Sequence, residues 1–293
     1  MMRNVLLFTI CSSLLLAACE RPYDIKLAEG MPQYTIDAFV SNSDSVQTIR
    51  ITKSIPFNAN PSTIPGVEGA QVALIDSTDF RVHFFSDQGK GSYTFKPNRS
   101  IGDTFRVGHQ YVLAVIIGSD TFISGSTMNP TAPVDSLALI KEEERFGLKA
   151  GQYVELGATD LPGRGNCYWI KTFVNGVLRG KINDLNLAYD GAFSPNAGSD
   201  GIPFIVPIRY IALNDFQNPY KSGDIIRVEI HSITPETLYF FSEVQQQLQN
   251  AGLFATIPAN VKSNVFNLNP QSSVKANGFF CMSAVSSRSV VIP

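Results

Sequence analysis

Charged residues are scarce in this chain, at 16% of 293 residues, and their signs nearly cancel to a formal net charge of −2. A chain without a basic excess offers no phosphate-binding face, so we expect no nucleic-acid partner. Catalytic motifs are missing as well. The histidines His83, His109 and His231 lie far apart in sequence, and no H-E-x-x-H, G-x-S-x-G or P-loop pattern occurs. We therefore predict a non-enzymatic protein with no catalytic residues, no cofactor and no metal site.

The chain also lacks a hydrophobic run long enough to cross a bilayer as a helix. The N-terminal run from Val5 to Ala18 has 14 residues. A helix of that length spans about 21 Å, which is short of a hydrocarbon core of about 30 Å. Arg3 precedes the run and small residues end it, and this pattern is typical of a secretory signal peptide.

Leu16-Ala17-Ala18-Cys19 ends the run and matches the bacterial lipobox. An aliphatic residue stands three before the cysteine, small residues follow, and the thiol accepts diacylglycerol. The sequence therefore predicts a lipoprotein signal peptide over 1–18, lipidation of Cys19 and a tether over 19–32. Several acyl chains hold a protein stably in a bilayer, so a membrane is the expected partner of Cys19. The alternative is an ordinary secretory signal that happens to contain a cysteine.

Aromatic residues and glycine are abundant, with 20 Phe and 22 Gly. Together with the low charge they favour an all-β fold. From Gln33 onward, short alternating stretches such as "YTIDAFVS" follow one another, separated by Gly, Asp or Asn. This spacing predicts β-sandwiches of the immunoglobulin or fibronectin kind. Because "NPTAPVDS" has the composition of a linker, we predict one sandwich domain over 33–133 and a second over 134–293.

The second predicted domain carries two distinct local signals. Asn175-Gly176 lies between two strand patterns and suits a type I′ hairpin turn. The stretch "TPETLYFFSEVQQQLQNAG" is helical instead, with Thr234 suited to the N-cap, Pro235 to the first turn and Gly252 to the C′ position. We predict one amphipathic helix over 235–251, inserted late in the second sandwich.

Two cysteines follow Cys19. Cys167 and Cys281 both lie in apolar strand patterns. Exported proteins form disulfides, which makes this pair a candidate disulfide. The alternative is two buried free thiols that behave as small hydrophobic residues.

Aromatic residues on two elements are candidate contacts for a protein partner. Tyr189 and Phe193 lie on the long loop 184–201, and Tyr239 and Phe240 lie beside the apolar stripe of the predicted helix. Aromatic side chains on loops of a rigid scaffold often bind partners. The same loop also carries oxygen ligands that leave a calcium site as an alternative to a polar surface loop, although their spacing fits no EF-hand: Asp184, Asp190, Asn196 and Asp200.

Several motifs in a fixed order resemble a known family. The lipobox and tether are followed by "YTIDAFVSNSDSVQTIRITKSIPFN" and "VEGAQVALID", and near the end come "VEIHSITPETLYFFSEVQQQL" and "NGFFCMSAVSSRSVVI". Together they resemble the domain-of-unknown-function family 4249, lipoproteins of Gram-negative bacteria. The closing strand departs from the family's usual "GYFS", because "GFFCMS" stands from Gly278. The resemblance implies no activity, but members are often encoded beside TonB-dependent receptors.

The expected function follows from the lipobox, the missing catalytic motifs and this resemblance. We expect a non-enzymatic outer-membrane lipoprotein, lipid-anchored and facing outward, that serves as an accessory or substrate-capture partner of a TonB-dependent β-barrel transporter. The alternative is a free-standing surface lipoprotein that adheres to glycans or envelope proteins. A hydrolase with a site assembled only in space is a third, weaker expectation. The sequence identifies neither a ligand nor an oligomeric state.

Overall fold

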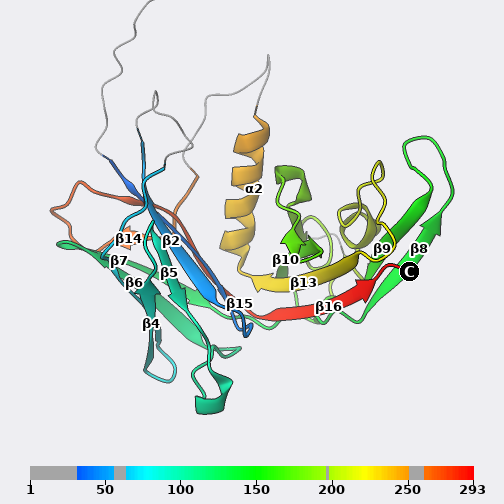
Figure 1. The fold of residues 1–293 in the computed structure, drawn as a ribbon. Helices are drawn as coiled ribbons and strands as arrows, with labels where there is room; N and C mark the ends of the chain where they lie inside the picture. Colours follow the sequence, from blue (N-terminus) through cyan, green and yellow to red (C-terminus); the bar gives the residue numbers. More distant parts are fainter. Residues whose placement is uncertain (1–31, 56–63, 196–197, 251–260) are drawn as a thin grey trace, which may run out of the picture. The chain divides into compact units, whose positions relative to one another are not determined.

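The structure is a computed structural model that describes residues 32–55, 64–195, 198–250 and 261–293. It is all-β with one long helix, which confirms the predicted fold class (Figure 1). The predicted signal peptide, Cys19 and almost all of the tether lie outside the described residues. The strands of the first half are β1 (Tyr34–Ser41), β2 (Gln47–Lys53), β3 (Gln71–Asp76), β4 (Arg81–Asp87), β5 (Ser92–Phe95), β6 (Gln110–Ile117) and β7 (Asp120–Thr127).

The second half adds shorter pieces and the helix. Its elements are β8 (Ser136–Glu142), β9 (Gly151–Gly157), β10 (Cys167–Val174), β11 (Val177–Leu178), β12 (Asn186–Tyr189), β13 (Ile225–Ile233), α2 (Pro235–Gln249), β14 (Phe266–Asn267), β15 (Ala276–Ser283) and β16 (Val285–Val291). Short helical turns lie at Arg99–Ile101, Ile182–Asp184 and Pro207–Ile211.

A nine-stranded sheet follows the order β14-β7-β6-β3-β4-β5-β2-β1-β15. The β4–β5 pairing is short, joining Ser86 to Thr94 and Asp87 to Tyr93, and the path folds over at this corner. We call β14-β7-β6-β3-β4 the β4 layer and β5-β2-β1-β15 the β1 layer. Apolar side chains from both layers meet in one buried cluster that includes Leu74, Leu113 and Ile36, so the two layers form a sandwich.

Strand alternation decides which side chains enter this core. In β3 the buried residues are Val72, Leu74 and Asp76, whereas Ala73 and Ile75 point to the outer face. The same period of two holds in β6, where Leu113 is fully buried. Since the period is fixed, each strand of the sandwich has an inner and an outer set of residues.

A second sheet in the order β11-β10-β13-β16, with β12 paired to β10, and the separate hairpin β8-β9 build the other part of the described chain. Their core includes Ile170, Val228 and Leu156. Asn175 and Gly176 adopt φ values of 51° and 81° between β10 and β11, which confirms the predicted hairpin turn.

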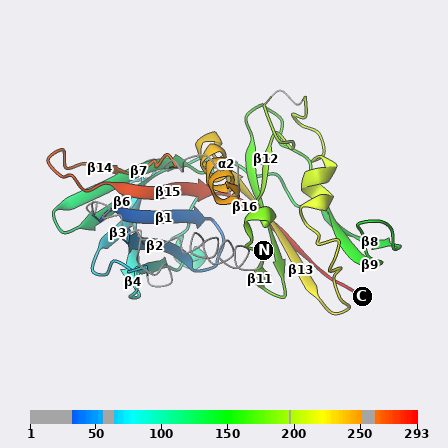
Figure 2. The same ribbon diagram turned by 90° about the horizontal axis from the view of Figure 1, so that it is seen from above.

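The late strands return to the first sheet. β15 pairs in parallel with β1 over its whole length, from Tyr34 with Ala276 to Ser41 with Ser283 (Figure 2). Residues 32–293 form one compact unit. The predicted division into 33–133 and 134–293 stays a prediction, but the nine-stranded sheet takes β14 and β15 from the later range.

Helix α2 begins as the sequence predicts. Thr234 is the N-cap and its hydroxyl accepts a hydrogen bond from the backbone N–H of Thr237, while Pro235 occupies the first turn. Leu238 and Phe241 are buried beneath the helix. The last helical residue is Gln249, and the predicted end at Ala251 lies outside the described residues.

Candidate functional site

Of the predicted contact residues, Tyr189 on loop 184–201 lies near Tyr239 on the helix. Tyr189 ends β12 opposite Cys167 of β10, and its backbone N–H donates to the carbonyl of Ala192 at 2.8 Å. Phe193 follows directly and is 63% exposed, and Tyr239 on α2 is 53% exposed. Burial raises the pKa of Tyr189, and the nearby Asp190, Cys167 and Tyr239 raise it further. Tyr189 packs against the buried cluster under α2, so we call only the exposed Phe193 and Tyr239 the aromatic surface.

Phe240, the fourth predicted contact residue, points into the protein instead of away from it. Its ring centroid lies 4.5 Å from that of Phe279 and 5.7 Å from that of Phe241. Phe240 therefore holds α2 on the β1 layer, and the exposed aromatic residue beside it is Tyr239. A helical pattern alone places both residues near the edge of the apolar stripe, so only the packing separates them.

The carboxylates of the loop bond to neighbouring segments of the same chain. Asp190 accepts hydrogen bonds from the backbone N–H groups of Gly165 and Asn166, both at 2.8 Å. Asp184 pairs with Arg179 at 2.7 Å, and Asp200 accepts from the N–H of Gly163. Asn196 lies outside the described residues. These bonds give Asp184, Asp190 and Asp200 a structural role, because each holds the loop to another segment.

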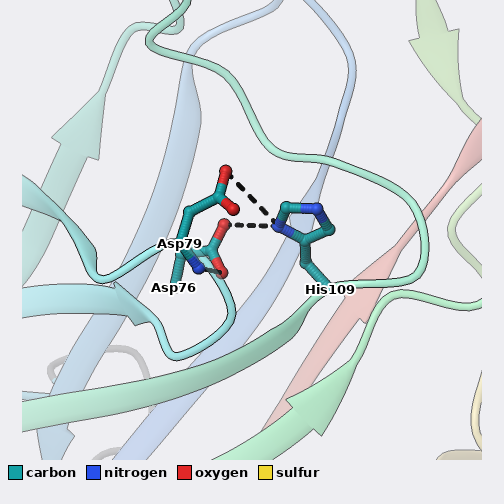
Figure 3. Close-up of side chains that lie close together, drawn as sticks. All are labelled: Asp76, Asp79 and His109. Carbon is teal, nitrogen blue, oxygen red and sulfur yellow. Dashed lines mark hydrogen bonds and ion pairs between the residues drawn. The ribbon is translucent and has the colours of Figure 1, made fainter.

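The described residues contain one group with the donor types of a metal site: Asp76, Asp79 and His109 (Figure 3). Asp76 ends β3, Asp79 lies in the following turn, and His109 immediately precedes β6. The Nδ1 atom of His109 donates to Asp76 at 2.7 Å and lies 4.0 Å from an Asp79 oxygen. Sequence reasoning missed this group because 30 residues separate Asp79 from His109 along the chain, although "DSTD" has the composition of a turn.

Every acidic member of this group already has hydrogen-bond donors. The second oxygen of Asp76 accepts from the N–H groups of Thr78 and Asp79, and Asp79 pairs with Arg106 at 2.7 Å. Burial raises the pKa of Asp76, but the bonds from His109 and from the turn outweigh it, so the net pKa is lowered. A divalent cation would have to displace these donors. The arrangement acts as a clamp between the β3–β4 turn and the start of β6.

A pocket of about 550 Å³ opens next to this clamp, at the seam where β7 approaches β15. Its lining mixes apolar side chains such as Val112 and Phe280 with polar residues that include Ser77, Gln110, Ser126, Thr234, Glu236 and Asn264. Two bonds hold the seam: Ser126 accepts from the backbone N–H of Met282 at 2.9 Å, and the amide of Asn264 bonds both backbone groups of Phe280. The pocket could take a small polar molecule beside the N-terminus of α2.

Comparison with known proteins places almost all of the described chain in one family. Residues 20–289 match the sequence profile described as Domain of unknown function (DUF4249). The chain belongs to the DUF4249 family. The predicted resemblance is therefore confirmed, and the match begins one residue after Cys19. No curated protein matches this DUF4249 chain. Among the described residues, no helix is both long and apolar enough to cross a membrane.

Of the two alternatives for the cysteines of this DUF4249 protein, the structure has the buried free thiols and not the disulfide. Cys167 and Cys281 are free thiols, both buried in the apolar cluster beneath α2. They sit on different sheets, where Cys167 pairs with Tyr189 and Cys281 with Phe39. Burial raises the pKa of Cys167 to about 12 and also raises that of Cys281. Both thiols therefore stay protonated at neutral pH, and a buried protonated thiol is a poor nucleophile.

A basic and aromatic strip runs along one face of β10 and β13. The Lys171 ammonium lies 3.8 Å over the Trp169 ring, and the Arg227 guanidinium lies 3.9 Å over Phe173. Glu229 stands opposite Lys171 but pairs with Arg227 and with His231 instead. Burial lowers the pKa of Lys171 to about 8. Trp169 is half-buried and carries this stack.

Proposed function

We propose that this DUF4249 protein is a non-enzymatic lipoprotein of the outer membrane, anchored through Cys19 and facing outward. It acts there as an accessory or substrate-capture partner of a TonB-dependent β-barrel transporter. The lipobox Leu16-Ala17-Ala18-Cys19 supports the anchor, and the family's usual gene neighbourhood supports the choice of partner. Neither the lipid anchor nor the contact with a transporter requires a catalytic group.

The observation that carries a role in protein contact is the aromatic surface. Tyr239 and Phe193 are exposed on elements held from below, because Phe240 and Tyr189 pack into the cluster beneath α2. Exposed aromatic residues on a rigid support lose little conformational entropy on binding, which is why Tyr and Trp dominate the binding energy of interfaces. The seam pocket, on the other side of the start of α2, offers a place for a small captured molecule.

The direct test is purification of the native, lipidated protein in a mild detergent, followed by mass spectrometry of what accompanies it. A stoichiometric β-barrel protein is the expected result. The variant Tyr239→Ala combined with Phe193→Ala should lose that partner. The matched control is Phe146→Ala, which removes a fully exposed Phe from the β8–β9 turn. A protein that purifies alone in several detergents would contradict the transporter role and favour the free-standing adhesin.

The anchor has its own test. Cys19→Ser removes the thiol that accepts diacylglycerol and leaves the rest of the signal intact. We expect the variant to remain unlipidated and uncleaved at this position. An acylated, cleaved product from the Cys19→Ser variant would show that the lipobox assignment is wrong.

A further inference from the structure

The outer face of the β4 layer is largely apolar, and among the described elements the start of α2 reaches only its margin, across the pocket that Val112 and Gly125 also line. One row of cross-strand neighbours runs across the whole layer: Phe84, Ala73, Ala114, Ile123 and Phe266. A second row contains Val82, Ile75, Val112 and Gly125. Ile116 lies in a third row, and Leu268 is exposed beside it. None of these residues is charged. We call them together the open face.

The outer face of a sandwich sheet is normally polar, so this pattern needs an explanation. The β1 layer of the same sandwich follows the rule. Where its outer face is open, it carries Thr48 and Arg50. Where it carries Phe39 and Phe279, helix α2 lies over them. Apolar outer residues are therefore covered on one layer and uncovered on the other.

The open face is as large as the largest apolar patches found on protein surfaces, and such patches are often binding sites. Phe84 is 74% exposed and Phe266 is 62% exposed. At about 4.8 Å between strands and 3.4 Å per residue, the rows cover roughly 24 by 20 Å, or about 500 Å². Monomeric proteins rarely leave more than a few hundred Å² of contiguous apolar surface, and a standard interface takes about 800 Å² from each partner. The open face supplies more than half of that area.

Its chemistry fits a second copy of the same chain. At a two-fold axis each residue meets the same surface on the partner, so a charge near the axis would face its own sign, and the open face has none. The small residues Ala73 and Ala114 lie in the middle of the first row and Phe stands at both ends. Two twisted sheets packed at about −30° lie closest at their centres and diverge toward the corners, which suits that order of sizes.

We propose that the open face docks a second copy of this chain, sheet against sheet, about a two-fold axis that passes over Ala114. An axis in the plane between the sheets, inclined by about 15° to the strands, gives this crossing angle, brings Phe84 of one copy opposite Phe266 of the other and leaves Ala114 opposite itself. The dimer does not depend on a transporter, so it stands or falls separately from the proposed function. It leaves the aromatic surface free, because Tyr239 and Phe193 belong to other elements.

The experiment is thiol-specific cross-linking of the full-length, lipidated protein in intact membranes. Ala114→Cys places a thiol at the proposed axis, and Thr48→Cys places a matched thiol on the exposed outer face of the β1 layer. The native Cys167 and Cys281 are buried and do not interfere. With a bis-maleimide whose spacer bridges the spacing of about 10 Å between stacked sheets, we expect a band of twice the mass for Ala114→Cys on a denaturing gel and only monomer for Thr48→Cys.

A second substitution makes the result specific. Phe84→Glu puts a charge at an exposed position of the open face, so it should abolish the cross-link of Ala114→Cys without unfolding the chain. Ile116→Cys, on the same central strand and also exposed, repeats the test from the third row in case Ala114→Cys does not fold. Monomer from both cysteine variants, a cross-linked product containing a different protein, or a dimer that survives Phe84→Glu would each overturn the proposal.

Discussion

The two layers of the sandwich share one core but treat their outer faces differently. On the β1 layer, the aromatic residues Phe39 and Phe279 lie under helix α2, with Phe39 stacked 5.0 Å from Phe241. On the β4 layer, Phe84 and Phe266 lie open. Outward-facing apolar residues in this fold therefore mark surfaces on which another element or another molecule packs. On one layer the docked element is part of the chain, and on the other we propose a second copy.

The largest expected effect comes from removing the cover of the β1 layer. Phe241 is buried and contacts both Phe39 and Trp169, the latter at 4.6 Å. Phe241→Ala should lower the free energy of unfolding by about 3–5 kcal/mol, because a buried aromatic leaves a cavity. Urea unfolding of the full chain, followed by tryptophan fluorescence, measures this. A loss near zero would mean that α2 does not hold the layer.

The second prediction concerns the edge where β15 closes the β1 layer. Gly278 has φ +96°, and a Cβ there would lie 2.2 Å from the carbonyl oxygen of Ile36. Gly278→Ala should cost about 2–4 kcal/mol through strain and the broken strand pair. Gly125, on the open face, has nothing near the position of a Cβ. Gly125→Ala is the control, and equal losses from both changes would contradict the described pairing.

A smaller, pH-dependent effect is expected at the clamp of the β4 layer. The pKa of Asp76 is lowered on folding, because hydrogen bonds from His109 and from the turn outweigh its burial. The carboxylate therefore stabilises the fold above its ordinary pKa of 3.8, and this contribution is lost as the pH falls through the folded value. Asp76→Asn should cost about 1–2 kcal/mol at neutral pH. The difference from the wild type should shrink below about pH 4.

The measurement is a series of unfolding curves for the wild type and Asp76→Asn between neutral and acidic pH. Asp120→Asn is not a suitable control, since that carboxylate also accepts hydrogen bonds. Glu144→Gln changes an exposed carboxyl on the β8–β9 turn and should show no such pH dependence. A gap between Asp76→Asn and wild type that stays constant down to strong acid would refute the role of the clamp.

The smallest effect is expected on the open face itself. Phe84→Thr removes an exposed ring from a strand and keeps a β-branched residue, so the stability of the single chain should change by less than about 0.5 kcal/mol. Unfolding at low protein concentration isolates the single chain from any second copy. A loss as large as that of Phe241→Ala would show that the open face is covered within the chain, and the contrast between the layers would fail.

Local patterns in the sequence were enough for several elements. The all-β class, the Asn175-Gly176 turn and the start of α2 at Thr234 and Pro235 each depend on neighbouring residues, and each is confirmed. The clamp of Asp76 with His109 was out of reach, because the two lie 33 positions apart and meet only through the pairing of β3 with β6. Whether Cys167 and Cys281 form a disulfide could not be decided from the sequence either, because the sequence does not give the distance between two strands.

The sequence by itself determined the short strands, the capped helix, the lipobox pattern and membership of the DUF4249 family, because all of these are written in adjacent or evenly spaced residues. Tertiary structure alone decided which apolar face is covered. The alternation in β1 and in β6 looks alike, and only the place where α2 packs distinguishes Phe39, which is sheltered, from Ile116, which is open. Burial depends on contacts between distant segments, and a local period cannot specify them.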